Sequence, residues 1–478
     1  MKGVPDIHLA ILPPYGTEGP PLGLAYVAAA LRQAGYTVKA ADYNIFLYRR
    51  FQQTLGHWWD MSIKTPWILP AELPGTIAAF GDAFDEMIDE MALGGAKIVG
   101  FSLNSDNRKL SAEVMRRVKV RNPQVKIIAG GLDAFTVEAR RYFPKNLVDA
   151  FVVGEGELAT VELVRALLNG DDPLDVPGVA QHDEPRRERK VEKNQDSFAF
   201  PTYEDFDLSQ YTTHNLPLVV SRGCVKGCTL CNDRKLMGSF RTRGAAHVFA
   251  EIRHHVERNS VRDFMLSDLQ ISQNLDVLLP LCHMIIDAGL DIHWNANAAV
   301  SERLTPEVLE TLRAAGCHTL TFGVESGSDA VLRLMNKQTD AQSTTNTLRA
   351  VKEAQIICWI NIVVGFPGET DEHFQETLAW LEANRDLYRE MGALNACNVV
   401  DNSIIGDHPE KYGILPTMDH NWIEVAWSDR YGNTPALRLE RLKQVHELLA
   451  RLDKPVRQSN LEPLREYTRL AEIFSDVL

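Results

Sequence analysis

The sequence predicts an α/β protein with two successive parallel sheets, followed by a helical C-terminal tail. Three observations indicate this class. Short apolar runs of strand length alternate with helical patterns, a charged stretch interrupts the alternation, and six more strand–helix units follow it. Because 478 residues are too many for one hydrophobic core, the chain should fold as several domains.

Residues 1–180 are expected to form the first domain, a doubly wound sheet of the Rossmann-like type. Residues 43–95 interrupt the strand–helix rhythm and are predicted to be an inserted helical segment. Three tryptophans of this segment, Trp58, Trp59 and Trp67, are expected to pack in a core. The expected strands of the domain are 7–12, 36–42, 96–103, 125–131 and 148–156.

Residues 181–212 are charged and nearly free of aliphatic side chains in their first half, which is typical of a linker. Residues 213–405 then repeat the strand–helix unit, which predicts a partial (β/α)6 barrel, three quarters of the eight-unit TIM type. Residues 406–478 are helical by pattern. The expected barrel strands are 216–221, 263–268, 291–297, 318–325, 358–365 and 394–400.

The composition excludes some partners. The formal net charge of −14 argues against nucleic acid held through its phosphates. The N-terminus lacks the apolar core of a signal peptide, and no apolar run approaches the length of a membrane span, so we expect no membrane partner. Seven cysteines without a secretory signal indicate reduced thiols and a cytoplasmic protein.

Three of the cysteines lie together directly after the first barrel strand, in RGCVKGCTLCN (222–232). Ligands of parallel α/β sheets bind at the carboxyl ends of strands, so this loop lies where chemistry is expected. A structural zinc ion would need a fourth ligand at short spacing. Three thiolates can hold an iron–sulfur cluster and leave one iron open, and we favour this over zinc and over unmetallated thiols. The three are Cys224, Cys228 and Cys231.

This Cys-x3-Cys-x2-Cys loop resembles that of the radical S-adenosylmethionine superfamily. Two later stretches, TFGVESGSDAVLRLMNK (321–337) and VVGFPGET (363–370), resemble the fourth- and fifth-strand signatures of the branch that carries an N-terminal cobalamin-binding domain. With LPPYGTEGPPLGLAYVAAAL and VVGEGE nearer the N-terminus, the resemblance covers roughly residues 1–405. It implies a 4Fe–4S cluster ligated by the three cysteines, S-adenosylmethionine on its open iron, and cobalamin.

The resemblance also implies the contacts to S-adenosylmethionine. At the end of the second strand, Asp268 would accept the amino group, and Ser267 would contact the cofactor beside it. Glu325 would bond the ribose hydroxyls or the amine, and Gly365 would let the adenine lie close to the backbone. For Asp268 and Glu325, capping of the next helix is the alternative.

Two positions depart from the family pattern. Leu230 stands where an aromatic residue commonly precedes the third cysteine, and it would contact S-adenosylmethionine from this position. Ala298 and Ala299 stand where many relatives carry an arginine. The group that holds the carboxylate of S-adenosylmethionine therefore stays open, with Arg222 or Arg243 as substitutes.

The resemblance assigns cobalamin to the first domain. The Asp-x-His-x-x-Gly motif of related domains is missing, so no histidine from it would bind cobalt. The alternative is a vestigial domain that only packs on the barrel. The candidate contacts are Ser102, Asn104, Arg108, Gly130, Gly131, Gly154 and Glu155.

The function expected from this resemblance is methylation of an unactivated centre of a small metabolite, with a flavodoxin or ferredoxin as electron donor. The alternative keeps the cluster without methyl transfer, as a cyclisation, rearrangement or oxidation, or as transfer of the 3-amino-3-carboxypropyl group. A non-catalytic sensor is a third possibility. Cys397, near the end of the sixth strand, could act as a catalytic thiol, or it could be buried and inert.

Overall fold

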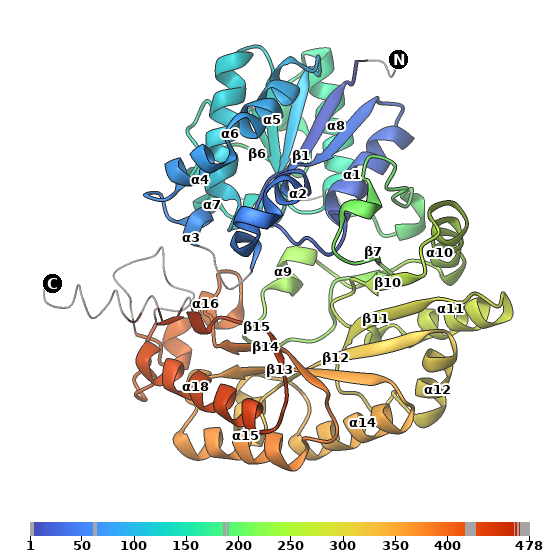
Figure 1. Ribbon diagram of the computed structural model, residues 1–478, viewed down its shortest axis with the longest axis vertical. Coiled ribbons are helices and arrows are strands. Elements are labelled where there is room, and N and C mark those ends of the chain that lie inside the picture. Colours follow the sequence, from blue (N-terminus) through green and yellow to red (C-terminus); the bar gives the residue numbers. More distant parts are fainter. Residues whose placement is uncertain are drawn as a thin grey trace, which may run out of the picture. The chain divides into compact units, whose positions relative to one another are not determined.

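The computed structural model of the protein describes residues 4–60, 65–184, 188, 191–415, 427–462, 464, 465 and 468. The chain forms two compact units (Figure 1). The first comprises Met1–Pro217 with His254–Val261, and the second comprises Leu218–Arg253 with Arg262–Leu478.

The first unit contains a six-stranded sheet in the order β2-β1-β3-β4-β5-β6. β1 to β5 are parallel and β6 runs antiparallel to β5, which confirms the doubly wound prediction. The chain leaves β1 toward β2 on one side and returns to β3 on the other, so the carboxyl ends of β1 and β3 form the switch point where such sheets bind ligands. The strands are β1 (Ile7–Ile11), β2 (Val38–Asp42), β3 (Ile98–Ser102), β4 (Lys126–Gly130), β5 (Ala150–Val152) and β6 (Val179–Ala180).

The inserted segment 43–95 is helical in its described part, as predicted. Asp42 caps its first helix by accepting a hydrogen bond from the backbone N–H of Ile45 at 2.9 Å. Trp59 and Trp67 are buried and Trp58 packs against them, which confirms their place in a core. The helices of this unit are α1 (Leu22–Gln33), α2 (Tyr43–Leu55), α3 (Thr65–Ile68), α4 (Leu73–Phe80), α5 (Asp82–Leu93), α6 (Arg108–Arg121), α7 (Val137–Arg141) and α8 (Gly156–Asn169).

The segment predicted as a linker packs on the first unit. Its second half buries four aromatic side chains, and the Tyr211 hydroxyl donates to Asp42 at 2.9 Å. Arg32 binds Asp205 at 2.6 Å. Aromatic burial outweighs the charge of the first half, of which residues 185–187, 189 and 190 lie outside the described part. The buried aromatic residues are Phe198, Tyr203, Phe206 and Tyr211.

The second unit is built on a seven-stranded sheet in the order β15-β14-β13-β12-β11-β10-β7. Six of the strands were predicted, but the seventh corrects the expectation of a purely helical C-terminal region. Residues 456–459 extend the sheet by pairing parallel with β14. The strands are β7 (Asn215–Leu218), β10 (Asp263–Leu266), β11 (His293–Ala298), β12 (Cys317–Glu325), β13 (Ile357–Val364), β14 (Glu390–Ala396) and β15 (Val456–Ser459).

Helices lie along one side of this curved sheet (Figure 1). Alternate residues of the strands, such as Leu320 and Phe322 of β12, are fully buried, as expected for the side that packs on helices. In the C-terminal region, residues 416–426, 463, 466, 467 and 469–478 lie outside the described part. The helices are α9 (Asp233–Met237), α10 (Ala245–Asn259), α11 (Leu275–Asp287), α12 (Pro306–Ala314), α13 (Asp329–Leu334), α14 (Ala341–Glu353), α15 (Asp371–Ala383), α16 (Ile404–Asp407) and α18 (Pro435–Arg451).

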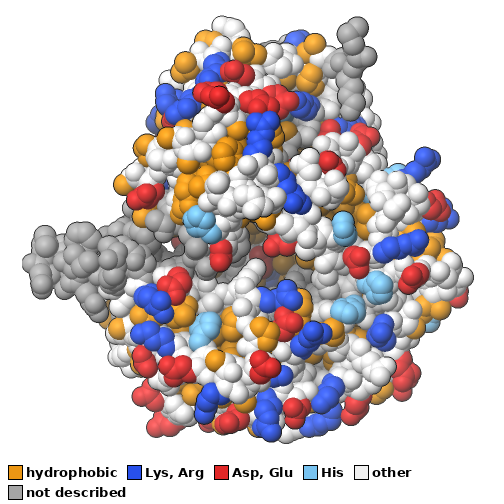
Figure 2. Space-filling model, viewed as in Figure 1, with side chains coloured by type: hydrophobic (Ala, Val, Ile, Leu, Met, Phe, Trp, Pro, Cys, Tyr) orange, Lys and Arg blue, Asp and Glu red, His pale blue; other side chains and the backbone are white. Residues whose placement is uncertain are grey.

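The surface is of mixed charge. On the face seen in Figure 2, acidic and basic side chains are interspersed over each unit. Within the described residues, none of the helices has both the length and the apolar character that a membrane crossing requires.

Candidate active site

The cysteine loop starts from a short hairpin, β8 (Ser221–Arg222) with β9 (Arg241–Thr242). Gly223 opens the loop with a φ of +78°. A Cβ atom at this position would lie 2.8 Å from the carbonyl oxygens of Gly238 and Ser239. Only glycine fits both the backbone conformation and the close approach of the other strand, so the residue before Cys224 is fixed by packing.

Hydrogen bonds from neighbouring loops fix the backbone between the cysteines. Gln273 accepts from the N–H of Val225 and donates to the carbonyl of Gly223, both at 3.0 Å. The Asn336 amide donates to the carbonyl of Gly227 at 2.7 Å, and the N–H of Thr229 donates to Met335 at 3.0 Å. The loop is therefore held in one conformation by the segments that follow β10 and β12.

The three thiols are half-buried and close enough to influence one another. Burial raises the pKa of Cys228, and the neighbouring thiol of Cys224 adds to the rise. Burial also raises the pKa of Cys231 to about 12. Among the described residues, no three His, Cys, Asp or Glu side chains converge on a point that would hold a single metal ion. In a cluster each thiolate binds a different iron, so the donor set fits a 4Fe–4S cluster better than a tetrahedral zinc.

Glu325 and Lys337 form a half-buried ion pair beside the cysteine loop. The Lys337 ammonium lies 3.1 Å from the Glu325 carboxylate, and each side chain is 15% exposed. Glu325 ends β12 with a φ of +68°, a conformation that non-glycine residues rarely adopt. Burial alone would lower the pKa of Lys337, but Glu325, Cys228 and Cys231 outweigh it and raise that pKa. Lys337 is thus a cation held next to the cysteines.

The sequence patterns do not single out Lys337. It closes the stretch 321–337 that carries the family resemblance, and this was the available signal. Arg243, considered as an anchor for a carboxylate, is buried and paired with Glu251 at 2.5 Å. Its guanidinium also donates to the carbonyl of Val219 at 2.8 Å. Lys337 is therefore better placed than Arg243 to meet an anionic group at the cysteines.

Asp268 is buried beneath the start of the cysteine loop. Its carboxylate accepts hydrogen bonds from the backbone N–H groups of Val220 at 2.9 Å and Ser221 at 2.6 Å, and from the Ser221 hydroxyl. Ser267 donates its N–H to Leu218 at 2.7 Å. This geometry favours a backbone-holding role for Asp268 over direct contact with an amino group, because both carboxylate oxygens are already in use.

Asp268 should make stability depend on pH. Burial raises its pKa to about 6, although the hydrogen bonds from Ser221 and Val220 oppose the rise. The folded state therefore binds a proton more tightly than the unfolded state, and stability is lost as the pH rises through about 6. We expect the unfolding free energy of wild type, relative to Asp268→Asn, to fall by about 2–3 kcal/mol between about pH 4 and pH 7. Urea unfolding at a series of pH values measures this, and parallel curves for the two proteins would contradict it.

Gly365 and Leu230, two further predicted contacts, pack within the chain itself. Gly365 follows β13 with a φ of +71°, and a Cβ there would lie 2.3 Å from Cγ of Arg438. Leu230 packs against an apolar cluster that includes Phe366 and Cys397. The buried Arg438 side chain of the C-terminal region thus requires the glycine at 365, whether or not adenine does.

A catalytic role for Cys397 is not supported. The side chain is 1% exposed within that apolar cluster, and burial raises the pKa of its thiol to about 12. A thiol so buried does not form the reactive thiolate at neutral pH, so the geometry fits the alternative of a buried inert cysteine.

In the first unit, the predicted cobalamin contacts lie at the carboxyl edge of the sheet. Ser102 ends β3 and is paired in register with Ile11 of β1 and Gly130 of β4. Asn104 caps the turn that follows by accepting from the N–H groups of Asp106 at 2.9 Å and Asn107 at 2.8 Å. These residues therefore share one edge, at the switch point of the sheet.

The other predicted cobalamin contacts at this edge differ in their ion pairs and in their backbone conformations. Arg108 forms a two-bond ion pair with the buried Asp133, which ties its guanidinium to the loop after β4. Gly154 has a φ of +98° and is followed by Glu155, which precedes α8. Gly131 also has a φ of +98°, and a Cβ there would lie 2.4 Å from the carbonyl oxygen of Leu103. Glycines thus let two loop backbones approach closely at this edge.

Replacing Gly131 by alanine should destabilise the first unit by about 3 kcal/mol, through its backbone conformation and the clash with Leu103. Gly170→Ala is the matched control, because Gly170 has a φ of +81° and open space around it. It should cost about 1 kcal/mol. Denaturant unfolding of both variants tests this, and equal losses would show that packing on Leu103 is unimportant.

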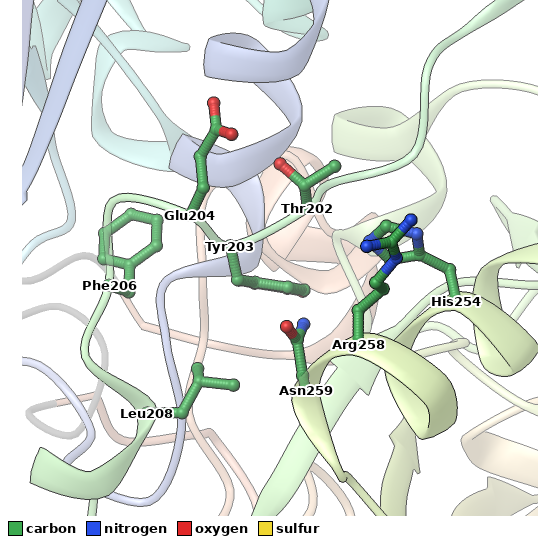
Figure 3. Close-up of a pocket in the computed structure, with 8 residues that line it drawn as sticks. All are labelled: Thr202, Tyr203, Glu204, Phe206, Leu208, His254, Arg258 and Asn259. Atoms are coloured by element: carbon green, nitrogen blue, oxygen red, sulfur yellow. The ribbon is translucent and has the colours of Figure 1, made fainter.

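A separate cavity of about 450 Å³ lies in the first unit (Figure 3). None of the residues predicted to contact a cofactor lines it, so it is not the site described above. Its lining residues are Thr202, Tyr203, Glu204, Phe206, Leu208, His254, Arg258 and Asn259.

Comparison with known proteins identifies proteins of similar sequence and fold. Residues 218–381 match the family described as the radical SAM superfamily. Over 385 residues the chain is 27% identical to an uncharacterised methyltransferase of Pyrococcus horikoshii, covering 78% of this chain and 76% of that protein. It is 24% identical over 438 residues to the cytidylyl-2-hydroxyethylphosphonate methyltransferase of Streptomyces wedmorensis, with 81% and 76% covered.

A solved structure shows the same two-domain fold. The radical S-adenosylmethionine methyltransferase TsrM from Kitasatospora setae, with cobalamin and a 4Fe–4S cluster bound, superposes with a TM-score of 0.66 at 16% identity. The match covers 87% of this chain and 81% of TsrM. The chain therefore contains a radical SAM domain over residues 218–381 and is an enzyme that uses a 4Fe–4S cluster and S-adenosylmethionine.

Proposed function

We propose that the protein is a cobalamin-dependent methyltransferase that acts on an unactivated centre of a small metabolite. The observation that carries this proposal is the combination of two sites in one chain. The cysteine loop with the Glu325–Lys337 pair belongs to the second unit, and the glycine-rich sheet edge belongs to the first. The methyltransferase names of both relatives and the cobalamin bound by TsrM support the same assignment.

In this proposal Cys224, Cys228 and Cys231 would hold the cluster, which would supply the site for S-adenosylmethionine and the electron for its reductive cleavage. Lys337 holds the carboxylate of S-adenosylmethionine, because it is a half-buried ammonium beside Cys228. Glu325 keeps Lys337 in place and bonds the ribose hydroxyls or the amine. The backbone at Gly365 lies against the adenine.

Cobalamin would carry the transferred methyl group. Ser102 and Asn104 would line its site at the ends of β3, and the backbones of Gly130, Gly131 and Gly154 would allow its nucleotide tail to pass closely. Arg108 would act indirectly, by fixing the loop around Asp133.

The metabolite is proposed to bind on the side of the barrel sheet opposite the helices. Strand register brings uncharged polar side chains together there, since Asn297 pairs with Thr321, and Asn361 lies in the next strand beside Gly323. A Cβ at position 392 would lie 2.6 Å from the Asn361 amide oxygen, which is buried and accepts no hydrogen bond within the described residues, so Gly392 leaves room for this amide. Such a surface favours a substrate with hydrogen-bonding groups and no net charge.

The test is reconstitution without oxygen, with flavodoxin or ferredoxin as the proposed electron donor. The protein should hold about four irons and one cobalamin per chain. Cys228→Ala should lose the iron and keep the cobalamin, because the two sites belong to different units. Turnover should give 5′-deoxyadenosine and S-adenosylhomocysteine. Protein that never retains cobalamin would refute the proposal.

A second candidate is radical chemistry without methyl transfer. Ala298 and Ala299 favour this second candidate. They stand where many relatives carry an arginine, so the carboxylate of the cofactor must be held differently. Methylthioadenosine as a product would indicate transfer of the 3-amino-3-carboxypropyl group, whereas 5′-deoxyadenosine alone would indicate cyclisation, rearrangement or oxidation.

A further inference from the structure

The loop that follows β13, residues 365–369, is held by side chains from the C-terminal part of the chain. The Asn433 amide donates to the carbonyl of Gly365 at 2.7 Å and to that of Phe366 at 3.2 Å. The Asp429 carboxylate accepts from the N–H of Gly368 at 2.9 Å. The loop thus relies for three of its backbone hydrogen bonds on residues more than sixty positions later in the chain.

Arg438 of α18 holds Asn433 in this position. Its side chain is fully buried and donates to the Asn433 amide oxygen at 3.1 Å and to the carbonyl of Trp427 at 2.6 Å. The guanidinium lies 3.9 Å from the centre of the Trp427 ring, which stabilises a buried cation. The aliphatic stem of Arg438 also packs directly against Gly365. Arg438 therefore determines both the hydrogen bonding and the position of the loop.

A second arginine of α18 closes the other end of the loop. Arg441 binds Glu369 at 2.8 Å, and the same carboxylate oxygen accepts from the N–H of Gly365 at 2.6 Å. Burial raises the pKa of Glu369 to about 7, and Arg441 opposes this rise. Arg441 therefore stabilises the charged form of Glu369, which closes the loop by accepting the hydrogen bond from Gly365.

We propose that Arg438 is a positioning residue for S-adenosylmethionine: acting through Asn433, it fixes the backbone of Gly365 against which the adenine lies. The inference rests on the proposed function, because it takes the 365–369 loop as the adenine site. Arg438 itself touches no cofactor. Two residues of this loop, Gly365 and Gly368, have positive φ and would gain freedom if the C-terminal contacts were lost.

The experiment compares Arg438→Met, Arg438→Lys and Asn433→Ala in the reconstituted holoenzyme. The readout is the change in the electron paramagnetic resonance spectrum of the reduced cluster on titration with S-adenosylmethionine. Arg438→Met and Asn433→Ala should each raise the Kd for S-adenosylmethionine about tenfold, which corresponds to the loss of one charge-assisted hydrogen bond. Lys at 438 should restore part of the affinity, because it keeps a buried cation and a donor.

The double variant and a surface control separate positioning from simple destabilisation. Arg438→Met combined with Asn433→Ala should bind no more weakly than either single variant, since both act on the same carbonyl. Arg451→Met, an exposed position at the end of the same helix, should leave the Kd unchanged. Thermal unfolding of each variant reports stability separately.

Wild-type affinity in both Arg438→Met and Asn433→Ala would overturn the positioning role while leaving the cofactor site intact. Additive losses in the double variant would also overturn it. A wild-type spectrum that never responds to S-adenosylmethionine would instead refute the cofactor site, and the positioning role would fall with it.

Discussion

Replacing Cys228 by alanine should remove the cluster and abolish reductive cleavage of S-adenosylmethionine. If three thiolates hold the cluster, as we propose, two would leave a second iron without a protein ligand, so iron content should fall from about four per chain toward zero. The loop backbone should survive, because Gln273 and Asn336 hold it through main-chain carbonyls that the substitution does not touch. Iron analysis and the visible absorption of anaerobically prepared protein measure the loss.

Cys282→Ala is the matched control for this prediction. Cys282 is buried on α11, where burial raises the pKa of its thiol to about 12, and it takes no part in the loop. Its replacement should leave iron content and 5′-deoxyadenosine formation unchanged. A tetrahedral zinc centre in wild type, or full turnover by the Cys228 variant, would remove the basis of the whole assignment.

Replacing Lys337 by methionine should raise the Kd for S-adenosylmethionine about tenfold to a hundredfold, because a charge-assisted hydrogen bond contributes about 1.5–3 kcal/mol. Methionine keeps the length and apolar stem of lysine, so most of the packing around the stem should persist. Titration of the reduced cluster with S-adenosylmethionine measures the affinity. Lys352→Met, on α14, is the control for loss of a lysine elsewhere in this unit.

A double variant shows whether Lys337 binds the cofactor or only balances Glu325. In the second case, Glu325→Gln combined with Lys337→Met should bind as tightly as Glu325→Gln alone, because no uncompensated carboxylate remains. If Lys337 holds the carboxylate of S-adenosylmethionine, the double variant should bind more weakly than Glu325→Gln alone. Equal affinity of these two variants would therefore contradict the role that we propose for Lys337.

Several features of the protein were predictable because they depend on local sequence. The parallel strands alternate or run apolar at a fixed period, so residues 317–325 and 357–364 were found within a residue or two. The cysteine loop was found because its three thiols are close together in the chain. Burial of Trp67 followed from composition alone, since a large apolar side chain in a helical insertion gains most by packing.

Other features were decided by the tertiary structure, because they depend on residues that only folding brings together. Nothing near Asp268 in the sequence shows that Val220 and Ser221 donate to it, forty-seven and more positions away. Residues 456–459 became a strand because the edge of β14 was free to pair, not because their own pattern is strand-like. Periodicity in the sequence shows which face of a helix or strand is buried, but the residue that packs on that face depends on the whole fold. The three thiols could therefore be found from the sequence, whereas the contacts of Lys337 and Arg438 could not.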